Sequence, residues 1–211
     1  LDTPDDVVFD KWQEMAFPNQ PMGRSILGKS EIIKTITRDQ VEGFMKGYYR
    51  PDKMVFSVSG NFDENNVIEL IEKYFQNLPQ GTEDHSPKAD YQGGEFRQEK
   101  NLEQVNVILG FEGVDFYSDL YYATAVYSTV LGSGMSSRLF QEIREKRGLV
   151  YSISSYASSF SDSGIFGVYA GTGQKEIMEL IPVLCDQLNI SAKEFSEEAL
   201  QRARAQFKSS L

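Results

Sequence analysis

Residues 151–172 read YSISSYASSFSDSGIFGVYAGT. Tyr, Ile, Val and Phe are frequent in both halves of this stretch, and such β-branched and aromatic residues favour strands. Between the halves, residues 161–164 read Ser-Asp-Ser-Gly, a composition typical of a turn. The stretch therefore predicts a β-hairpin with strands at Tyr151–Phe160 and Ile165–Thr172.

A third strand is predicted at residues 105–111, where apolar side chains alternate at the two-residue period of a strand with one buried face. A short apolar strand is also predicted at 54–59. Capping residues and apolar periods of 3.6 predict helices around these strands, at 5–15, 37–49, 63–78, 118–131, 136–147 and 175–188, with a last helix after a Ser191-x-x-Glu194 capping box. Groups of strands and groups of helices together predict an α+β fold, with an antiparallel or mixed sheet covered by helices.

The segment at 81–94 contains Gly, Pro, Asp, Ser and Thr but no hydrophobic period. Such a composition is typical of an exposed connection between domains. The sequence therefore predicts a domain piece at 1–80, a linker at 81–94 and a second domain piece at 95–211. The apolar spacing of the strand and helix at 54–78 recurs at 165–188, which hints at two related halves.

Charge and hydropathy narrow the classes of partner that are expected for this chain. The 211 residues carry a formal net charge of −10, which disfavours nucleic acid as a partner because binding depends on neutralising phosphates. No apolar run approaches the roughly 20 residues of a membrane span, so we expect no membrane partner. The chain starts without a basic or apolar leader and stops inside a helical pattern, so we expect an internal fragment of a longer protein.

The sequence contains no recognisable set of side chains that could form a complete catalytic site on its own. The one histidine, His85, lies in the predicted linker, where it is expected to be solvated because a zinc site needs three or four ligands. The one cysteine, Cys185, is expected on a buried apolar helix face. A nucleophile needs a base within hydrogen-bond reach, and neither residue offers such a pair.

The segment 132–152 reads GSGMSSRLFQEIREKRGLVYS. It closely resembles the signature of the second domain in the M16 family of zinc metallopeptidases, which includes insulinase and mitochondrial processing peptidase. Residues 21–28, 49–55 and 162–167 agree with the family in the same order. The resemblance covers nearly the whole chain and implies pieces of two LuxS/MPP-like domains from a bacterial member, with residues 95–211 in the inactive, non-metal domain.

The resemblance also implies which chemistry is absent and which is retained. The family holds zinc through a His-x-x-Glu-His helix and a later Glu, and none of these is in this sequence, so zinc is expected in the parent protein and not in this segment. Arg144 and Tyr151, seven residues apart, match the family pair that reaches substrate carbonyl groups. The alternative is structural: a cation at a helix end and an aromatic residue in a strand. Gly132–Gly134 resembles a glycine-rich loop near the substrate path, or simply ends a helix.

Two functions follow from the resemblance. The first is the substrate-binding, non-catalytic segment of a zinc metalloendopeptidase that cleaves peptides or presequence-like segments. The second is a non-catalytic homologue, either a partner subunit of a processing peptidase or a structural protein like the core subunits of the cytochrome bc1 complex. The expected partners are a peptide or unfolded polypeptide, the rest of the parent chain and a second half or subunit. The expected compartment is the bacterial cytoplasm.

Overall fold

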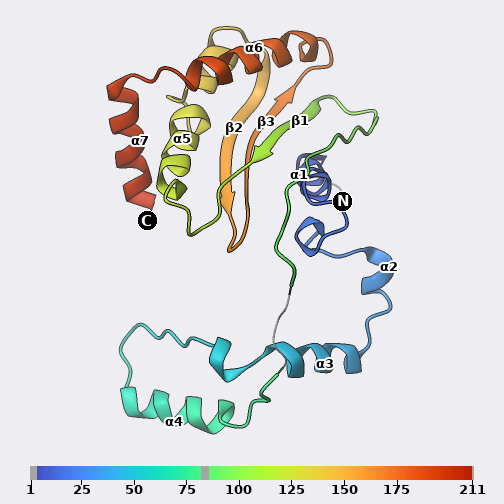
Figure 1. Ribbon diagram of the computed structural model, residues 1–211, viewed down its shortest axis with the longest axis vertical. Coiled ribbons are helices and arrows are strands. Elements are labelled where there is room, and N and C mark those ends of the chain that lie inside the picture. The colour runs from blue at the N-terminus through green and yellow to red at the C-terminus, as the bar shows by residue number, and fades with distance from the viewer. Residues whose placement is uncertain (1–3, 82–85, 211) are drawn as a thin grey trace. The chain divides into compact units, whose positions relative to one another are not determined.

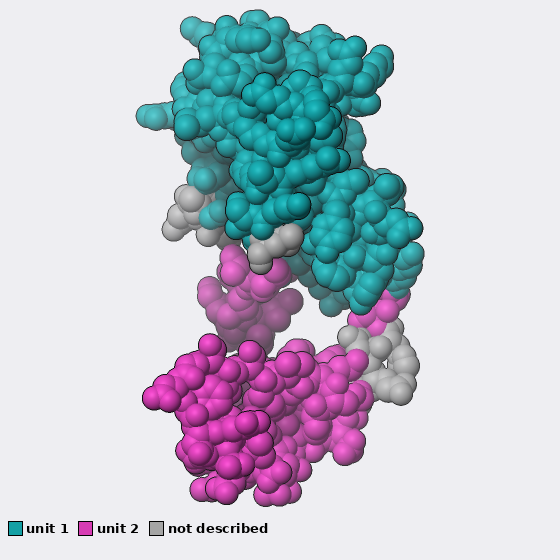
Figure 2. Space-filling view, turned by 90° about the vertical axis from the view of Figure 1, so that its left-hand side faces the viewer, with its two compact units in different colours: residues 1–25, 88–211 teal, residues 26–87 magenta. Residues whose placement is uncertain are grey.

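The computed structural model describes residues 4–81 and 86–210 (Figure 1). Its internal contacts divide the chain into two compact units, coloured in Figure 2. Unit 1 comprises residues 1–25 and 88–211, and unit 2 comprises residues 26–87. These units describe contacts within this chain, and the domain boundaries inferred from the sequence stay a prediction.

Unit 1 is built on one antiparallel sheet of three strands. They are β1 (Val105–Glu112), β2 (Val150–Ser159) and β3 (Gly164–Thr172), in the order β1-β3-β2. Both neighbours of β3 run antiparallel to it. The predicted hairpin, the third strand and the α+β class are therefore confirmed.

Helices cover both faces of this sheet (Figure 1). On one face, α5 (Tyr121–Gly132) and α6 (Ile177–Ser191) enclose the main core, which consists of Leu131, Leu139, Ile143, Leu149, Val150, Ile153, Phe166, Val168, Ala170, Leu180 and Leu184. On the other face lies α1 (Pro4–Ala16). Its Phe9 ring contacts the rings of Tyr156 and Tyr169, and Trp12 fills the space that a side chain at position 110 would need, which explains Gly110.

The structure corrects the predicted burial of α6. Cys185 is exposed, and the buried residues of the helix are Leu180, Leu184, Gln187 and Ser191. Ile177, Val183 and Leu188 are partly buried against the main core, so most of the apolar face of this helix packs as expected and Cys185 lies outside it. The buried face also includes two polar side chains that have partners: Arg138 donates to Gln187, and the Ser191 hydroxyl bonds with Tyr127 and with the Leu188 carbonyl.

Two predicted helix starts also differ from the structure. Ser191 is the last residue of α6 and not a cap, and α7 (Glu197–Ser210) begins after Ser196, whose hydroxyl accepts from the Ala199 N–H. Ser118 makes a similar bond to the Leu120 N–H, and α5 begins three residues later than predicted. Serine favours such local turns as readily as helix caps.

Unit 2 contains α2 (Ser30–Ile33), α3 (Arg38–Tyr48), α4 (Glu64–Phe75) and a 3₁₀ turn at Pro51–Lys53. A short 3₁₀ turn at Pro21–Gly23 belongs to unit 1. The predicted caps Thr37 and Asp63 are confirmed, because each side chain accepts from the N–H three residues on.

The predicted strand at 54–59 is wrong for this chain, and the hint of two matching strand–helix units fails with it. No described residue pairs with this segment, and Val55 is 93% exposed. An extended segment becomes a strand of a sheet only when its backbone forms hydrogen bonds with a neighbouring strand.

Candidate functional site

The segment 132–152 forms a helical turn that leads directly into β2. It begins at the end of α5, where Gly132 lies so close to the backbone of Ser155 that no side chain fits. Gly134 has a φ of +80°, a left-handed conformation that glycine adopts without strain. Gly132–Gly134 therefore ends α5, as the structural alternative expected.

The turn that carries Arg144 is wider than the α-helix predicted from the sequence. It is a π-helix at Phe140–Glu145, and the Lys146 N–H donates to the carbonyl of Gln141, five residues earlier. Wide turns of this kind are rare and frequently occur at functional sites. Leu139 and Ile143 hold the turn in the core, since both are fully buried.

The turn ends as predicted, and the chain then reverses into β2. Gly148 has a φ of +65°, the left-handed conformation of a residue that follows a helix. The Gly148 N–H donates to the carbonyl of Arg144, and the Leu149 N–H donates to that of Ile143. These bonds fix the backbone on both sides of Arg144.

Tyr151 lies at an irregularity in the pairing of β2 with β3. Val150 is opposite Thr172 in the sheet, but Ser152 is opposite Gly171, so Tyr151 is an extra residue on β2. Such a bulge re-aims a side chain and is common beside active sites. The Tyr151 side chain is 63% exposed, and its hydroxyl forms no hydrogen bond with the described residues. It is therefore available to an external acceptor.

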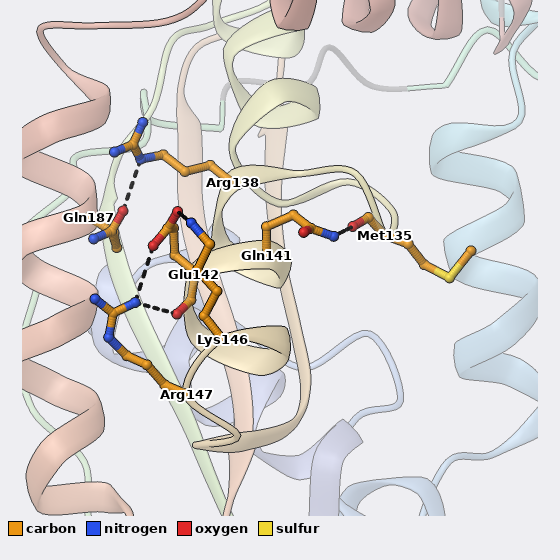
Figure 3. A network of polar contacts seen from close by, with 7 residues as sticks. All are labelled: Met135, Arg138, Gln141, Glu142, Lys146, Arg147 and Gln187. Carbon is orange, nitrogen blue, oxygen red and sulfur yellow. Dashed lines mark hydrogen bonds and ion pairs between the residues drawn. The ribbon is translucent and has the colours of Figure 1, made fainter.

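Glu142 engages the cations that neighbour Arg144 (Figure 3). Its carboxylate accepts from Lys146 Nζ at 2.5 Å and from Arg147 Nη1 at 3.2 Å. Arg147 also donates to the Glu142 carbonyl. The hydrogen bonds from Lys146 and then Arg147 hold the pKa of Glu142 below its usual value, so the carboxylate is ionised at neutral pH.

Two further bonds tie the turn to its surroundings (Figure 3). Arg138 Nε donates to Gln187 Oε1 of α6 at 3.0 Å, and Gln141 Nε2 donates to the Met135 carbonyl at 2.8 Å. The first joins the turn to α6, and the second closes the loop before it. The π-turn is thus held by its neighbours.

Arg144 is the exception in this turn. It is exposed, and no carboxylate within residues 4–81 and 86–210 forms an ion pair with it. The centre of its guanidinium lies 4.7 Å from the centroid of the Phe140 ring. A guanidinium carries five N–H donors and a phenol one, so Arg144 and Tyr151 can both donate hydrogen bonds to oxygens of a bound molecule.

The described residues do not fit a zinc site. Among them, no group of three or more His, Cys, Asp or Glu side chains is placed to hold a metal ion. His85 lies outside the described residues. Cys185 is exposed on α6, and it belongs to no such group. A search of the described helices also found none that is long and apolar enough to cross a membrane.

The sequence analysis identified Arg144 and Tyr151 but missed the residues that surround Arg144 and bind its neighbouring cations. Phe140 and Arg144 are four residues apart, as are Glu142 and Lys146. Side chains with this spacing lie on the same helix face, so both pairs could have been found from the sequence. The π-turn and the bulge have no comparable signal.

Comparison with known proteins identifies the family. A family model described as the peptidase M16 inactive domain matches residues 35–207. The chain belongs to this family. The resemblance seen in the sequence is therefore confirmed.

Relatives of this M16 chain are named as zinc proteases. It is 38% identical to an uncharacterized zinc protease of Rickettsia bellii and 34% identical to one of Bacillus subtilis. Each match covers 100% of this chain, but 51% and 52% of the relative. The chain thus spans about half the length of these relatives.

Solved structures share the M16 fold. A peptidase M16 inactive domain from Pseudomonas fluorescens aligns with a TM-score of 0.84 at 20% identity, over 99% of this chain and 52% of that one. A chain of complex III2 from Candida albicans, solved with Inz-5 bound, aligns with a TM-score of 0.87 at 24% identity, over 99% and 52%. At these identities the likeness concerns the fold alone.

Proposed function

We propose that this chain is the substrate-binding, non-catalytic segment of a zinc metalloendopeptidase. In this proposal, Arg144 and Tyr151 donate hydrogen bonds to carbonyl oxygens of a peptide or unfolded polypeptide near the bond to be cleaved. Such oxygens gain negative charge during hydrolysis, and fixed donors stabilise that charge. The protein would act on peptides or presequence-like segments in the bacterial cytoplasm, without nucleic acid or a membrane as partner.

The observation that carries the proposal is the difference between Arg144 and the other cations of its turn. Lys146 and Arg147 are both bound to Glu142, and Arg138 donates to Gln187. Arg144 has no such partner among the described residues and is exposed. An exposed guanidinium without an ion pair keeps its N–H donors for a substrate, whereas stabilising a helix end does not require those donors to be free.

Zinc belongs to the proposal through the relatives, which are named zinc proteases. Since the described residues offer no set of ligands, zinc would be held by other parts of the parent chain. Residues 1–80 would be the end of that metal-bearing first domain, 81–94 the linker and 95–211 the start of the second domain. A second half or subunit would complete the substrate chamber.

Substitutions in the full-length protein test this function. Arg144→Ala or Tyr151→Phe should each lower kcat/KM for a fluorogenic peptide by about 10- to 1000-fold, the range for losing a donor to developing charge. Melting temperature and zinc content should stay unchanged, because both side chains are exposed. Elemental analysis of the same preparations measures the zinc.

Arg147→Ala is the matched control, since it also removes a guanidinium, from a residue three positions after Arg144. Arg147 is already bound to Glu142, so its loss should leave kcat/KM within about twofold of the wild type. If Arg144→Ala and Tyr151→Phe both retain wild-type kcat/KM, the proposed role is wrong. Arg144 would then be only a cation at a helix end.

The fold of the complex III2 chain supports a second candidate, a partner or structural subunit without activity of its own. The two candidates predict different zinc contents and different peptide-cleaving activities for the full-length protein. A full-length protein that contains zinc and cleaves peptides supports the first. One that contains no zinc, cleaves nothing and copurifies with a homologous subunit supports the second.

A further inference from the structure

Phe140 lies between the core and Arg144. Its ring is partly buried against the main core of unit 1, and the Arg144 guanidinium lies 4.7 Å from the ring centroid. One side of Phe140 is thus fixed by packing, while Arg144 is exposed. The ring is the one aromatic group that meets this guanidinium within the described part of the chain.

An exposed arginine without a partner has many rotamers, and binding a substrate would require it to give up that freedom. A planar guanidinium stacks on an aromatic ring through cation–π attraction and dispersion. Stacking restricts the rotamers but leaves the N–H groups at the edge of the guanidinium free to donate. A carboxylate would restrict them too, but it would occupy the donors.

We propose that Phe140 is a positioning residue for Arg144, which holds the guanidinium ready to donate to the substrate. This inference rests on the proposed function of Arg144. Glu142 has a complementary role in it, because its carboxylate is engaged by Lys146 and Arg147 and does not capture Arg144. The turn therefore provides one cation that is oriented without being neutralised.

The alternative is that Phe140 has only a structural role, as part of the core. A core residue affects the stability of the whole domain, whereas a positioning residue affects activity through Arg144 alone. The two roles can be separated by a double-mutant cycle, since residues that act through one another have non-additive effects.

The experiment measures kcat/KM of the full-length protein with a fluorogenic peptide. Phe140→Leu keeps an apolar side chain but removes the ring, and it should lower kcat/KM by about 3- to 10-fold, as expected for losing a cation–π contact. Phe140→Tyr keeps a ring and should stay within about twofold of wild type. In an Arg144→Ala background, Phe140→Leu should cause no further loss, because the side chain that it orients is gone.

Phe166→Leu is the matched control, because Phe166 lies in the same core and is 8% exposed. It should lower the melting temperature but not kcat/KM per folded molecule. If Phe140→Leu itself unfolds the protein, Phe140→Met takes its place, since methionine fills irregular core space.

Each result bears on a different claim. Equal kcat/KM for wild type and Phe140→Leu, or losses that multiply with those of Arg144→Ala, would overturn the positioning role and leave Arg144 as a substrate-binding residue. If Arg144→Ala itself has wild-type activity, Arg144 does not bind the substrate and this inference is wrong; the proposed function is wrong as well if Tyr151→Phe also has wild-type activity.

Discussion

Unit 1 and unit 2 carry similar apolar patterns but differ in what they bury. Unit 1 encloses Leu131, Leu139 and Leu180, which are all fully buried. None of the described residues of unit 2 is buried, although the predicted stripe on α4 is present and Phe56 contacts Phe75. Large exposed apolar patches are typical of interaction surfaces.

The difference shows what an amphipathic pattern can establish. The pattern tells which face of a helix requires burial, but not whether the covering residues lie in the same chain. In unit 1 the sheet supplies the cover. For unit 2 we expect the cover to come from the parent chain outside these residues, in keeping with the proposal that residues 1–80 complete a first domain.

The largest effect is expected from the same substitution made in each unit of this 211-residue chain. Leu131→Ala should lower the free energy of unfolding by about 2–5 kcal/mol, because it leaves a cavity in the core. Leu70→Ala, at a position on α4 that is 44% exposed, should change it by less than about 1 kcal/mol. Urea unfolding followed by circular dichroism measures both. Equal losses would show that unit 2 has a core of its own.

Hydrogen exchange sharpens the comparison for the segment 54–59. In this chain its amides at 55–59 should exchange as fast as those of an open loop, since no described residue pairs with them. In the full-length protein they should exchange at least about 100-fold more slowly, because a neighbouring strand would pair with them. The amides of β3, which is paired on both sides, serve as the protected reference. Fast exchange at 55–59 in the full-length protein would contradict the domain proposal.

The smallest effect concerns Glu142 in unit 1. Because Lys146 and Arg147 lower its pKa in the folded state, its stabilising contribution is complete above the unfolded pKa and is lost as pH falls through the folded one. Glu142→Gln should therefore lower the melting temperature by a few degrees at pH 7 and by progressively less as the pH falls toward 2.

Glu145→Gln is the control for this pH dependence. Glu145 is exposed and forms no ion pair with the described residues, so its substitution should have no effect at either pH. A loss for Glu142→Gln that is as large near pH 2 as at pH 7 would show that its cause is not the charge.

Much of unit 1 could be predicted from the sequence. The alternation at 105–111 and the two halves of 151–172 identified all three strands of the sheet, because a period of two has one physical meaning in a half-buried strand. The exposure of Cys185 on α6 was missed, since the residues around it are mostly apolar. The buried Gln187 and Ser191 could not be predicted either, because their partners Arg138 and Tyr127 are far away in the sequence.

The candidate site was predictable in its residues but not in its geometry. The family signature at 132–152 pointed to Arg144 and Tyr151. Neither the π-turn under Arg144 nor the bulge at Tyr151 could be predicted, because both depend on how the turn packs onto the sheet. The predicted strand at 54–59 failed because no described residue pairs with this segment.

The central claim is that Arg144 and Tyr151 donate hydrogen bonds to a bound peptide. A crystal structure of the full-length protein with an uncleaved peptide, after removal of metal by a chelator, tests it most directly. We expect a nitrogen of the Arg144 guanidinium and the hydroxyl of Tyr151 to lie about 2.7–3.2 Å from peptide carbonyl oxygens. A bound peptide with both side chains more than about 6 Å from its nearest oxygen, beyond any direct hydrogen bond, would contradict the claim.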